Sequence, residues 1–239
     1  MQIGISTGVC FPFLKGKLQQ VKLLSEFREM VDGLEIIFPR PLDLVNFNPK
    51  GRARALAKQF GFVTIHYPFP KHVRLSALPE KRLLAKLGAI DRELPIKHVV
   101  LHPGSAKSWK PFKESGLVFL LENQRYGKNR RWRTPISMKA LLDETGFGMC
   151  LDLNHAMGWG IKPEKFLLLG KRIRQVHVNA TEAFGSESHR FVSESSPKAA
   201  GLAKNALSGL KHAVWMIEAK SPVSPRRKIE REIAFLESI

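Results

Sequence analysis

Gly148-Met149-Cys150-Leu151-Asp152-Leu153-Asn154-His155 is an apolar run that ends in a carboxylate and an imidazole. Five other apolar runs end in the same way, in a side chain that can hold a metal. Short aliphatic and β-branched runs of this length are typical of buried parallel strands. The five runs are residues 62–65 before His66, 99–101 before His102, 117–121 before Glu122, 173–176 before His177 and 213–217 before Glu218.

Amphipathic segments separate the apolar runs, so strands and helices are expected to alternate along the chain. A cap residue followed by proline marks four helix starts: Asn48-Pro49, Thr134-Pro135, Ser196-Pro197 and Ser224-Pro225. Strands are predicted near residues 2–7, 33–38, 62–67, 98–103, 117–122, 148–153, 173–178 and 213–219. Helices are predicted near residues 17–30, 49–60, 79–94, 135–145, 163–170, 197–210 and 225–238.

Eight strands that alternate with helices predict an α/β fold of the (β/α)8, or TIM barrel, type. We expect one domain over residues 1–239. The segment 104–116 is short and rich in Pro and Gly, so a shortened or missing helix is expected between strands 4 and 5. An open, doubly wound sheet is the alternative, but no glycine-rich phosphate loop follows the first strand.

In such a barrel, the C-terminal ends of all strands surround one crater, where the terminal polar residues would gather. Imidazoles and carboxylates in this mixture suit zinc, with manganese or iron as alternatives. A single buried histidine is usually structural, but five of the eight share this pattern; His72, His98 and His212 do not, and we interpret them as structural or surface groups. Strand residues two apart point the same way. The layer below the crater is therefore predicted to contain Thr64, Val100, Leu120, Cys150, Gln175 and Met216.

The composition favours a soluble protein with a polyanionic partner. Lys and Arg number 39 against 21 acidic residues, which gives a net charge of +18. Such a charge favours nucleic acid as the first candidate partner and an anionic membrane surface as the second. The plainer explanation is a host organism whose proteins are generally basic. Cys10 and Cys150 are too few for a disulfide framework and fit a reducing interior. No signal peptide or membrane span is recognisable. We expect a monomer that is cytoplasmic and nucleoid-associated, with no membrane partner.

Six short segments carry a resemblance to a known family: His102-Pro103-Gly104-Ser105, Glu122-Asn123, Cys150-Leu151-Asp152-Leu153-Asn154-His155-Ala156, His177-Val178-Asn179, Glu187-Ser188-His189 and Ile217-Glu218. In this order they resemble the endonuclease IV family of apurinic/apyrimidinic endonucleases (AP endonuclease family 2), within the xylose isomerase-like barrel superfamily. The resemblance runs from about the third strand to the eighth and occupies all nine ligand positions. Glu187 stands where the family pattern has Asp.

The resemblance implies up to three zinc ions per chain and a DNA repair nuclease that cuts 5′ to abasic sites. Glu122, Asp152, His177 and Glu218 would be the catalytic ligands. Hydrolysis of an anionic phosphodiester needs a positioned nucleophile and compensation of developing charge, which a metal-bridging hydroxide and its zinc ions would supply. The resemblance implies one set of ligands for each zinc ion. The first zinc would bind His66, His102 and Glu122. The second would share Glu122 and also bind Asp152, His177 and Glu218, and the third would bind His155, Glu187 and His189.

Loops on the crater side are basic and aromatic, which favours damaged double-stranded DNA as the partner. Cations neutralise phosphates, and aromatic rings stack on or wedge between bases. The alternatives are a solvated surface for the arginines and local packing for each tryptophan. The resemblance places Phe69 where the family inserts an aromatic ring, and gives Arg40 a similar part. The other predicted DNA contacts are Lys107, Trp109, Arg125, Arg130, Arg131, Trp132 and Arg133.

Two other classes of function remain open. A sugar or sugar phosphate isomerase or epimerase of the same superfamily would use one divalent metal on Glu122, Asp152, His177 and Glu218. A non-catalytic nucleic-acid-binding barrel would hold no metal. The additional residues His66, His102, His155, Glu187 and His189 favour the nuclease, because a one-metal isomerase does not need them.

Overall fold

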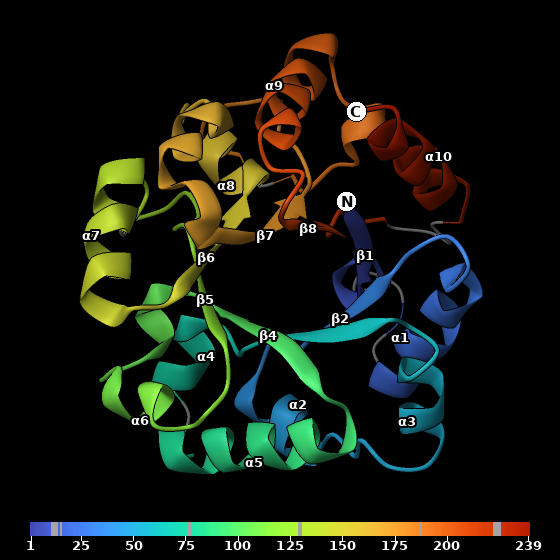
Figure 1. The fold of residues 1–239 in the computed structure, drawn as a ribbon, viewed down its shortest axis with the longest axis vertical. Coiled ribbons are helices and arrows are strands. Elements are labelled where there is room, and N and C mark those ends of the chain that lie inside the picture. Colours follow the sequence, from blue (N-terminus) through green and yellow to red (C-terminus); the bar gives the residue numbers. More distant parts are fainter. Residues whose placement is uncertain (11–13, 15, 76–77, 129–130, 187, 222–225) are drawn as a thin grey trace.

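The computed structural model describes residues 1–10, 14, 16–75, 78–128, 131–186, 188–221 and 226–239. Within them, eight parallel strands pair in sequence order, and the last pairs with the first to close a barrel. Helices surround the barrel on the outside (Figure 1), as predicted for a TIM barrel. The strands are β1 Gln2–Ser6, β2 Gly33–Ile37, β3 Phe62–His66, β4 Ile96–Leu101, β5 Phe119–Glu122, β6 Gly148–Asp152, β7 Ile173–Val178 and β8 Val214–Ile217.

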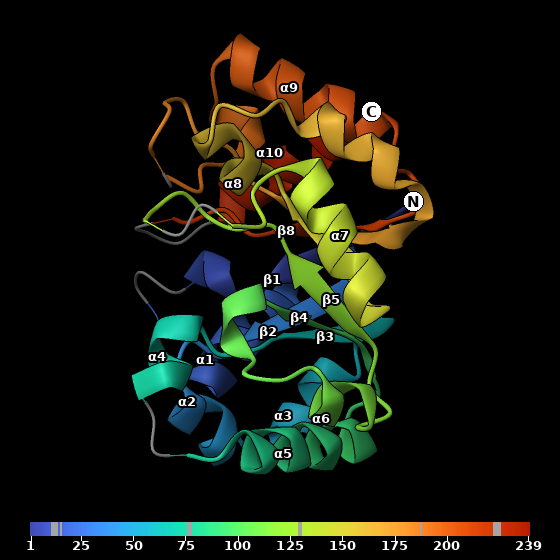
Figure 2. The ribbon, with the colours of Figure 1, turned by 90° about the vertical axis from the view of Figure 1, so that its left-hand side faces the viewer.

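The α-helices and short 3-10 segments lie between the strands. In Figures 1 and 2, α5 and α9 lie on opposite sides of the barrel. The α-helices are α1 Lys17–Leu24, α2 Pro41–Asn46, α3 Arg52–Ala57, α4 Pro70–Leu75, α5 Glu80–Glu93, α6 Lys110–Lys113, α7 Pro135–Thr145, α8 Leu153–Gly158, α9 Pro197–Ser208 and α10 Arg226–Glu237. The 3-10 segments are η1 Thr7–Cys10, η2 Ser25–Phe27, η3 Pro103–Ser105, η4 Pro163–Arg172 and η5 Val192–Glu194.

The connection between β4 and β5 contains the predicted shortened helix. It consists of η3 and α6, and α6 has only four residues. Phe112 of α6 is fully buried, and its ring lies 5.1 Å from that of Phe119 on β5 and 6.2 Å from that of Trp109. A single aromatic side chain therefore covers the strand where a longer helix would otherwise pack.

Two of the predicted helix starts are confirmed. Thr134 caps α7 by accepting the backbone N–H of Ser137, and Ser196 caps α9 by accepting that of Ala199. The start predicted at Asn48-Pro49 is wrong, because the Asn48 side chain accepts the N–H of Lys50 at 3.1 Å and closes a turn; α3 begins only at Arg52. The start predicted at Ser224-Pro225 lies outside the described residues.

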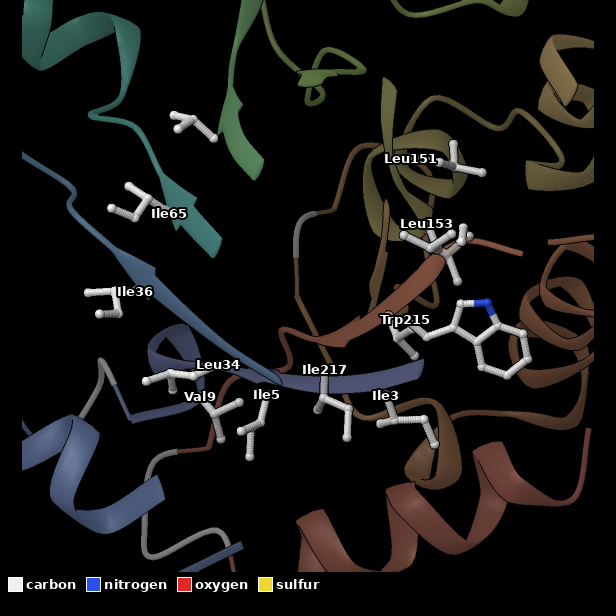
Figure 3. Close-up of a cluster of buried hydrophobic side chains, with 14 of the residues drawn as sticks. Ile3, Ile5, Val9, Leu34, Ile36, Ile65, Leu151, Leu153, Trp215 and Ile217 are labelled. Atoms are coloured by element: carbon white, nitrogen blue, oxygen red, sulfur yellow. The ribbon is translucent and has the colours of Figure 1, made fainter. Parts of the chain in front are cut away.

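Alternation along the strands divides the buried side chains into two groups. Ile3 and Ile5 of β1 and Trp215 and Ile217 of β8 belong to the large cluster between barrel and helices (Figure 3). Inside the barrel, Val100, Leu120 and Cys150 form a separate small cluster. The full layer predicted below the crater is buried at 0% exposure: Thr64, Val100, Leu120, Cys150, Gln175 and Met216.

Gly4 on β1 leaves room for this interior packing. A Cβ atom at Gly4 would lie 2.6 Å from the terminal methyl of Met216 on β8, well inside van der Waals contact. The absent side chain therefore lets Met216 fill the barrel centre. Any larger residue at Gly4 would have to displace it.

Candidate metal centre

A crater of about 370 Å³ opens at the C-terminal ends of the strands. The wall includes residues from loops after β1, β2, β3, β4, β5, β6, β7 and β8. Its floor is formed by His66, Glu122 and Glu218, which are at most 9% exposed. The parallel strand register thus brings side chains from distant parts of the sequence into one buried group.

Glu122 lies at the centre of this group and faces two sets of side chains. Its Oε2 atom lies 3.2 Å from His66 Nε2 and 3.3 Å from His102 Nε2. Its Oε1 atom lies 3.0 Å from His177 Nδ1 and 3.6 Å from His155 Nδ1. One carboxylate therefore offers one oxygen to each set, which is the arrangement that a ligand shared by two metal ions requires.

The second set contains His177, Glu218 and Asp152. His177 Nδ1 lies 3.0 Å from Glu218 Oε2 and 3.8 Å from Asp152 Oδ2. One ligand atom from each of these residues and from Glu122 lies within 4.8 Å of the others. Asp152 is held from both sides, because its Oδ1 accepts the N–H of His155 and its Oδ2 accepts a hydrogen bond from Asn179.

The residues of the implied third set are described in part. His155 Nδ1 donates to the carbonyl of Asn123 at 3.0 Å, so its Nε2 is the nitrogen left for a metal. The His189 ring lies 5.8 Å from that of His155, and His189 has a positive φ of 44°, uncommon for a residue with a side chain. Glu187 lies outside the described residues. The structure brings the two histidines together but does not test the complete set.

Burial perturbs the titration of these groups in opposite directions. It lowers the pKa of His102 to about 3. Burial would also lower the pKa of His66, but the hydrogen bond and charge of Glu122 outweigh it and raise the pKa to about 9. Burial, together with the charges of Glu122 and Glu218, raises the pKa of Asp152 to about 6. The group therefore contains buried charges, which are costly unless opposite charges and hydrogen bonds offset them.

The residues fit a divalent metal such as zinc. With metal–ligand bonds of about 2.1 Å, tetrahedral ligands stand about 3.4 Å apart, close to the 3.0–3.3 Å separations around Glu122. The Oε2 atom of Glu218 is buried and has no hydrogen-bond partner among the described residues, although it lies 3.0 Å from His177 Nδ1. A carboxylate oxygen and an imidazole nitrogen 3.0 Å apart are a pair of donor atoms that one cation can bind.

The rim of the crater is cationic. Lys71 after β3, Arg125 and Lys128 after β5, and Lys220 after β8 are exposed and line it. The acidic residues that line the described crater, Glu122 and Glu218, belong to its buried floor. A cleft lined by one sign of charge attracts ligands of the opposite sign.

The predicted DNA-contacting residues are distributed over several environments. Phe69 and Arg125 line the crater, and the Phe69 ring lies 5.4 Å from that of His66. Arg40 is paired with Asp43 and lines a neighbouring groove of about 970 Å³. Arg130 lies outside the described residues. The remaining residues do not line either cavity: Lys107, Trp109, Arg131, Trp132 and Arg133.

The aromatic residues of these loops pack within the protein. The Trp109 ring lies 6.0 Å from that of Phe147, and Trp132 is partly buried against the core. The guanidinium of Arg133 lies 4.8 Å from the ring of Trp159, which is 8% exposed. A part in DNA binding remains a prediction for these side chains.

Glu35 is the main residue that the sequence analysis did not identify. It lies in the middle of β2, is fully buried, and its Oε2 atom is 3.3 Å from His177 Nε2. Burial by itself would raise the pKa of the Glu35 carboxyl. The charge and the hydrogen bond of His177, which faces Glu35, outweigh burial, so the pKa is lowered. A charged residue inside an otherwise apolar strand was the available signal. His72, interpreted as structural or surface, in fact lines both the crater and the groove.

His98 should make the protein sensitive to acid. Burial and the charges of Lys97 and Arg174 lower the pKa of His98 to about 4. The unfolded chain binds this proton near pH 6.5, so the folded state loses stability as pH falls from about 6.5 to about 4, by about 3 kcal/mol for a shift of this size. In urea unfolding of the metal-free protein, His98→Gln should show a flatter pH profile than the wild type. Parallel profiles would contradict this account.

Comparisons with known proteins establish the fold but not the function. No family model matches the chain, and no curated protein matches it. Among solved structures, endonuclease IV from Thermus thermophilus is 21% identical with a TM-score of 0.67, and each chain is covered over 100%. A D-tagatose 3-epimerase-like protein is 18% identical with a TM-score of 0.69, over 100% of this chain and 98% of the other.

A third similar structure is a Thermus thermophilus protein whose crystal was soaked with ZnCl2. It is 18% identical with a TM-score of 0.65, over 100% of this chain and 99% of the other. Similarity at this level establishes the fold, a TIM barrel, and leaves the activity open. In the described part of the chain, no helix is long and apolar enough to span a membrane.

Proposed function

We propose that this protein is a metal-dependent phosphodiesterase that cuts DNA 5′ to abasic sites. The observation that carries the proposal is the position of Glu122, whose two oxygens face separate groups of ligand atoms. A one-metal site needs Glu122, Asp152, His177 and Glu218. His66 and His102 lie 3.2 and 3.3 Å from the remaining Glu122 oxygen and form a second donor set.

The charge distribution supports an anionic substrate. The cationic rim of Lys71, Arg125, Lys128 and Lys220 surrounds a floor that would hold the metals. Rim cations would bind the phosphates that flank the scissile bond, and Phe69, beside His66 and His102, would contact the sugar or base next to it. The net charge of +18 favours the same class of partner.

Each residue of the floor has a defined task in this proposal. His66 and His102 would hold one metal, and Asp152, His177 and Glu218 a second, with Glu122 shared between them. When bound, the metals would supply positive charge for the developing transition state and activate water near neutral pH. Asn179 orients Asp152, and the carbonyl of Asn123 orients His155. Burial of the floor excludes bulk water and strengthens these interactions.

A sugar epimerase or isomerase is the second candidate. Its four ligands are complete in the described residues, and the crater volume of about 370 Å³ is in the range of small-molecule sites. Such an enzyme would use one metal and would not require His66 and His102 as ligands. Metal stoichiometry therefore separates the two candidates: at least two per chain favours the phosphodiesterase, and one favours the epimerase.

The deciding experiment is incubation of the zinc-loaded protein with a duplex that carries one abasic site. We expect a single cut 5′ to the site and no cut in the matched undamaged duplex. A panel of ketoses and their phosphates, followed by chromatography, provides the parallel assay for the second candidate. Turnover of a sugar with intact DNA in the first assay would reject the nuclease proposal.

The rim cations should control the salt dependence of DNA binding. The triple variant Lys71→Ala, Lys128→Ala, Lys220→Ala should bind abasic duplex more weakly, and the slope of log affinity against log salt should fall by about 0.9 for each lost phosphate contact. The matched control is Lys58→Ala, Lys171→Ala, Lys211→Ala, which removes three exposed lysines near the opposite end of the barrel. Equal slopes for the two triple variants would exclude the rim from the DNA interface.

A further inference from the structure

A tier of polar side chains lies inside the barrel directly beneath the metal centre. Glu35 on β2 and Gln175 on β7 are fully buried, and Gln175 Nε2 donates to Glu35 Oε2 at 2.7 Å. Thr64 Oγ1 on β3 donates to the same oxygen at 3.3 Å. A buried carboxylate in this position is costly unless it is used for hydrogen bonding or charge compensation.

The tier meets the metal centre at His177. The Nδ1 atom of His177 faces the oxygens of Glu122 and Glu218 at 3.0 Å, whereas its Nε2 atom faces Glu35 Oε2 at 3.3 Å. The two ring nitrogens thus serve opposite sides, one toward the metal ligands and one toward the barrel interior. When Nδ1 binds a metal, the remaining ring proton must be on Nε2.

The surroundings of Nε2 offer one oxygen acceptor for that proton, and the Cys150 thiol, which also lies within hydrogen-bond reach of His177, is only a weak acceptor. Gln175 Nε2 lies 3.1 Å from His177 Nε2, but an amide nitrogen only donates. Among the described residues, the oxygen acceptor within reach of His177 Nε2 is Glu35 Oε2, at 3.3 Å. Gln175 and Thr64, which both donate to Glu35 Oε2, hold that oxygen in place.

We propose that Glu35 is a positioning residue for the metal centre: its carboxylate accepts the Nε2–H of His177 and thereby presents Nδ1 to the metal shared with Glu122, Asp152 and Glu218. Carboxylates that accept the second N–H of a ligating histidine fix its tautomer and ring orientation and raise its basicity. This inference rests on the metal-binding part of the proposed function and is independent of whether the substrate is DNA or a sugar.

The first test compares zinc affinity in competition with a chromophoric chelator. Glu35→Gln keeps the shape but loses the charge, and Glu35→Leu removes the acceptor. We expect affinity for the tightest site to fall about 10- to 100-fold in Glu35→Gln, the usual range for such partners, and further in Glu35→Leu. The Co²⁺-loaded forms should also differ from the wild type in the visible absorption of the ion, because the His177 ligand is reoriented.

The matched control is Glu232→Gln on α10. Glu232 is also fully buried, and it accepts the backbone N–H groups of Val192 and Ser193, away from the crater. This variant should lower the unfolding temperature but leave zinc affinity unchanged. Equal zinc affinity in Glu35→Gln, Glu35→Leu and the wild type would overturn the inference.

A second measurement uses the wild-type protein and does not depend on the folding of variants. In ¹⁵N-histidine-labelled, zinc-loaded protein, long-range ¹H–¹⁵N correlation spectra report which nitrogen of His177 carries the proton, with His177→Gln used for assignment. We expect a proton on Nε2 and metal on Nδ1; the reverse would overturn the inference. If Glu35→Gln binds zinc weakly and the zinc-loaded wild type leaves abasic DNA intact, the inference stands and only the nuclease proposal is rejected.

Discussion

Glu122→Gln is expected to lower cleavage of an abasic duplex by about a hundredfold or more at saturating zinc. An amide has one acceptor oxygen, and its nitrogen only donates, so the variant can serve one of the two ligand sets but not both. Glu122 is 1% exposed, so both of its oxygens lie in the buried floor of the crater. Removal of one key stabilising group from an active site typically has an effect of this size. Single-turnover rates on a labelled duplex measure it.

The control for this variant is Glu114→Gln, which changes an exposed carboxylate on the C-terminal side of α6. It should cut at the wild-type rate. Metal content measured on the same preparations links activity to binding, and Glu122→Gln should hold fewer zinc ions per chain than the wild type. Wild-type rate and metal content in Glu122→Gln would exclude a shared-ligand role.

The positions of the ligand residues were predictable because they follow from periodicity. A strand has a fixed direction and a two-residue repeat, so a polar residue at the end of each apolar run must lie at one end of a closed parallel barrel. His66, Glu122 and Asp152 are the last residues of β3, β5 and β6. His102 follows β4 directly, and Glu218 follows β8.

Other features depend on contacts that periodicity does not specify. Glu35 lies two residues before the end of β2, and its function depends on a side chain 142 positions away in sequence, His177. Lys71 lies on α4, and Lys128 and Lys220 lie on loops. Packing sets the course of these segments, so the common position of the three lysines around the crater could not be read from spacing. The start of α3 was also predicted incorrectly. The Asn48 side chain closes a local turn in place of a helix cap, and the helix begins only at Arg52.

Metal loading is expected to raise the thermal stability of the protein markedly. The folded state brings Glu122, Asp152 and Glu218 together in a buried floor, whereas the unfolded chain has no such site. A ligand that binds only the folded state stabilises it by about 4 kcal/mol at a thousandfold excess over the dissociation constant. For a chain of this size, each kcal/mol shifts the unfolding temperature by about 2–4 °C, so an increase of about 8–16 °C is expected.

Calorimetric scans with excess zinc and with a strong chelator measure this increase. The matched variant is Asp152→Asn, which keeps the size of the side chain but removes one charged ligand atom facing His177. Its metal-free form should unfold near the temperature of the metal-free wild type, because neutralising a buried carboxylate that repels Glu122 and Glu218 offsets the loss of one of the two hydrogen bonds that Asp152 accepts. The same variant should gain much less from zinc. An increase of equal size in both proteins would mean that zinc acts elsewhere, and no increase in the wild type would remove the metal centre itself.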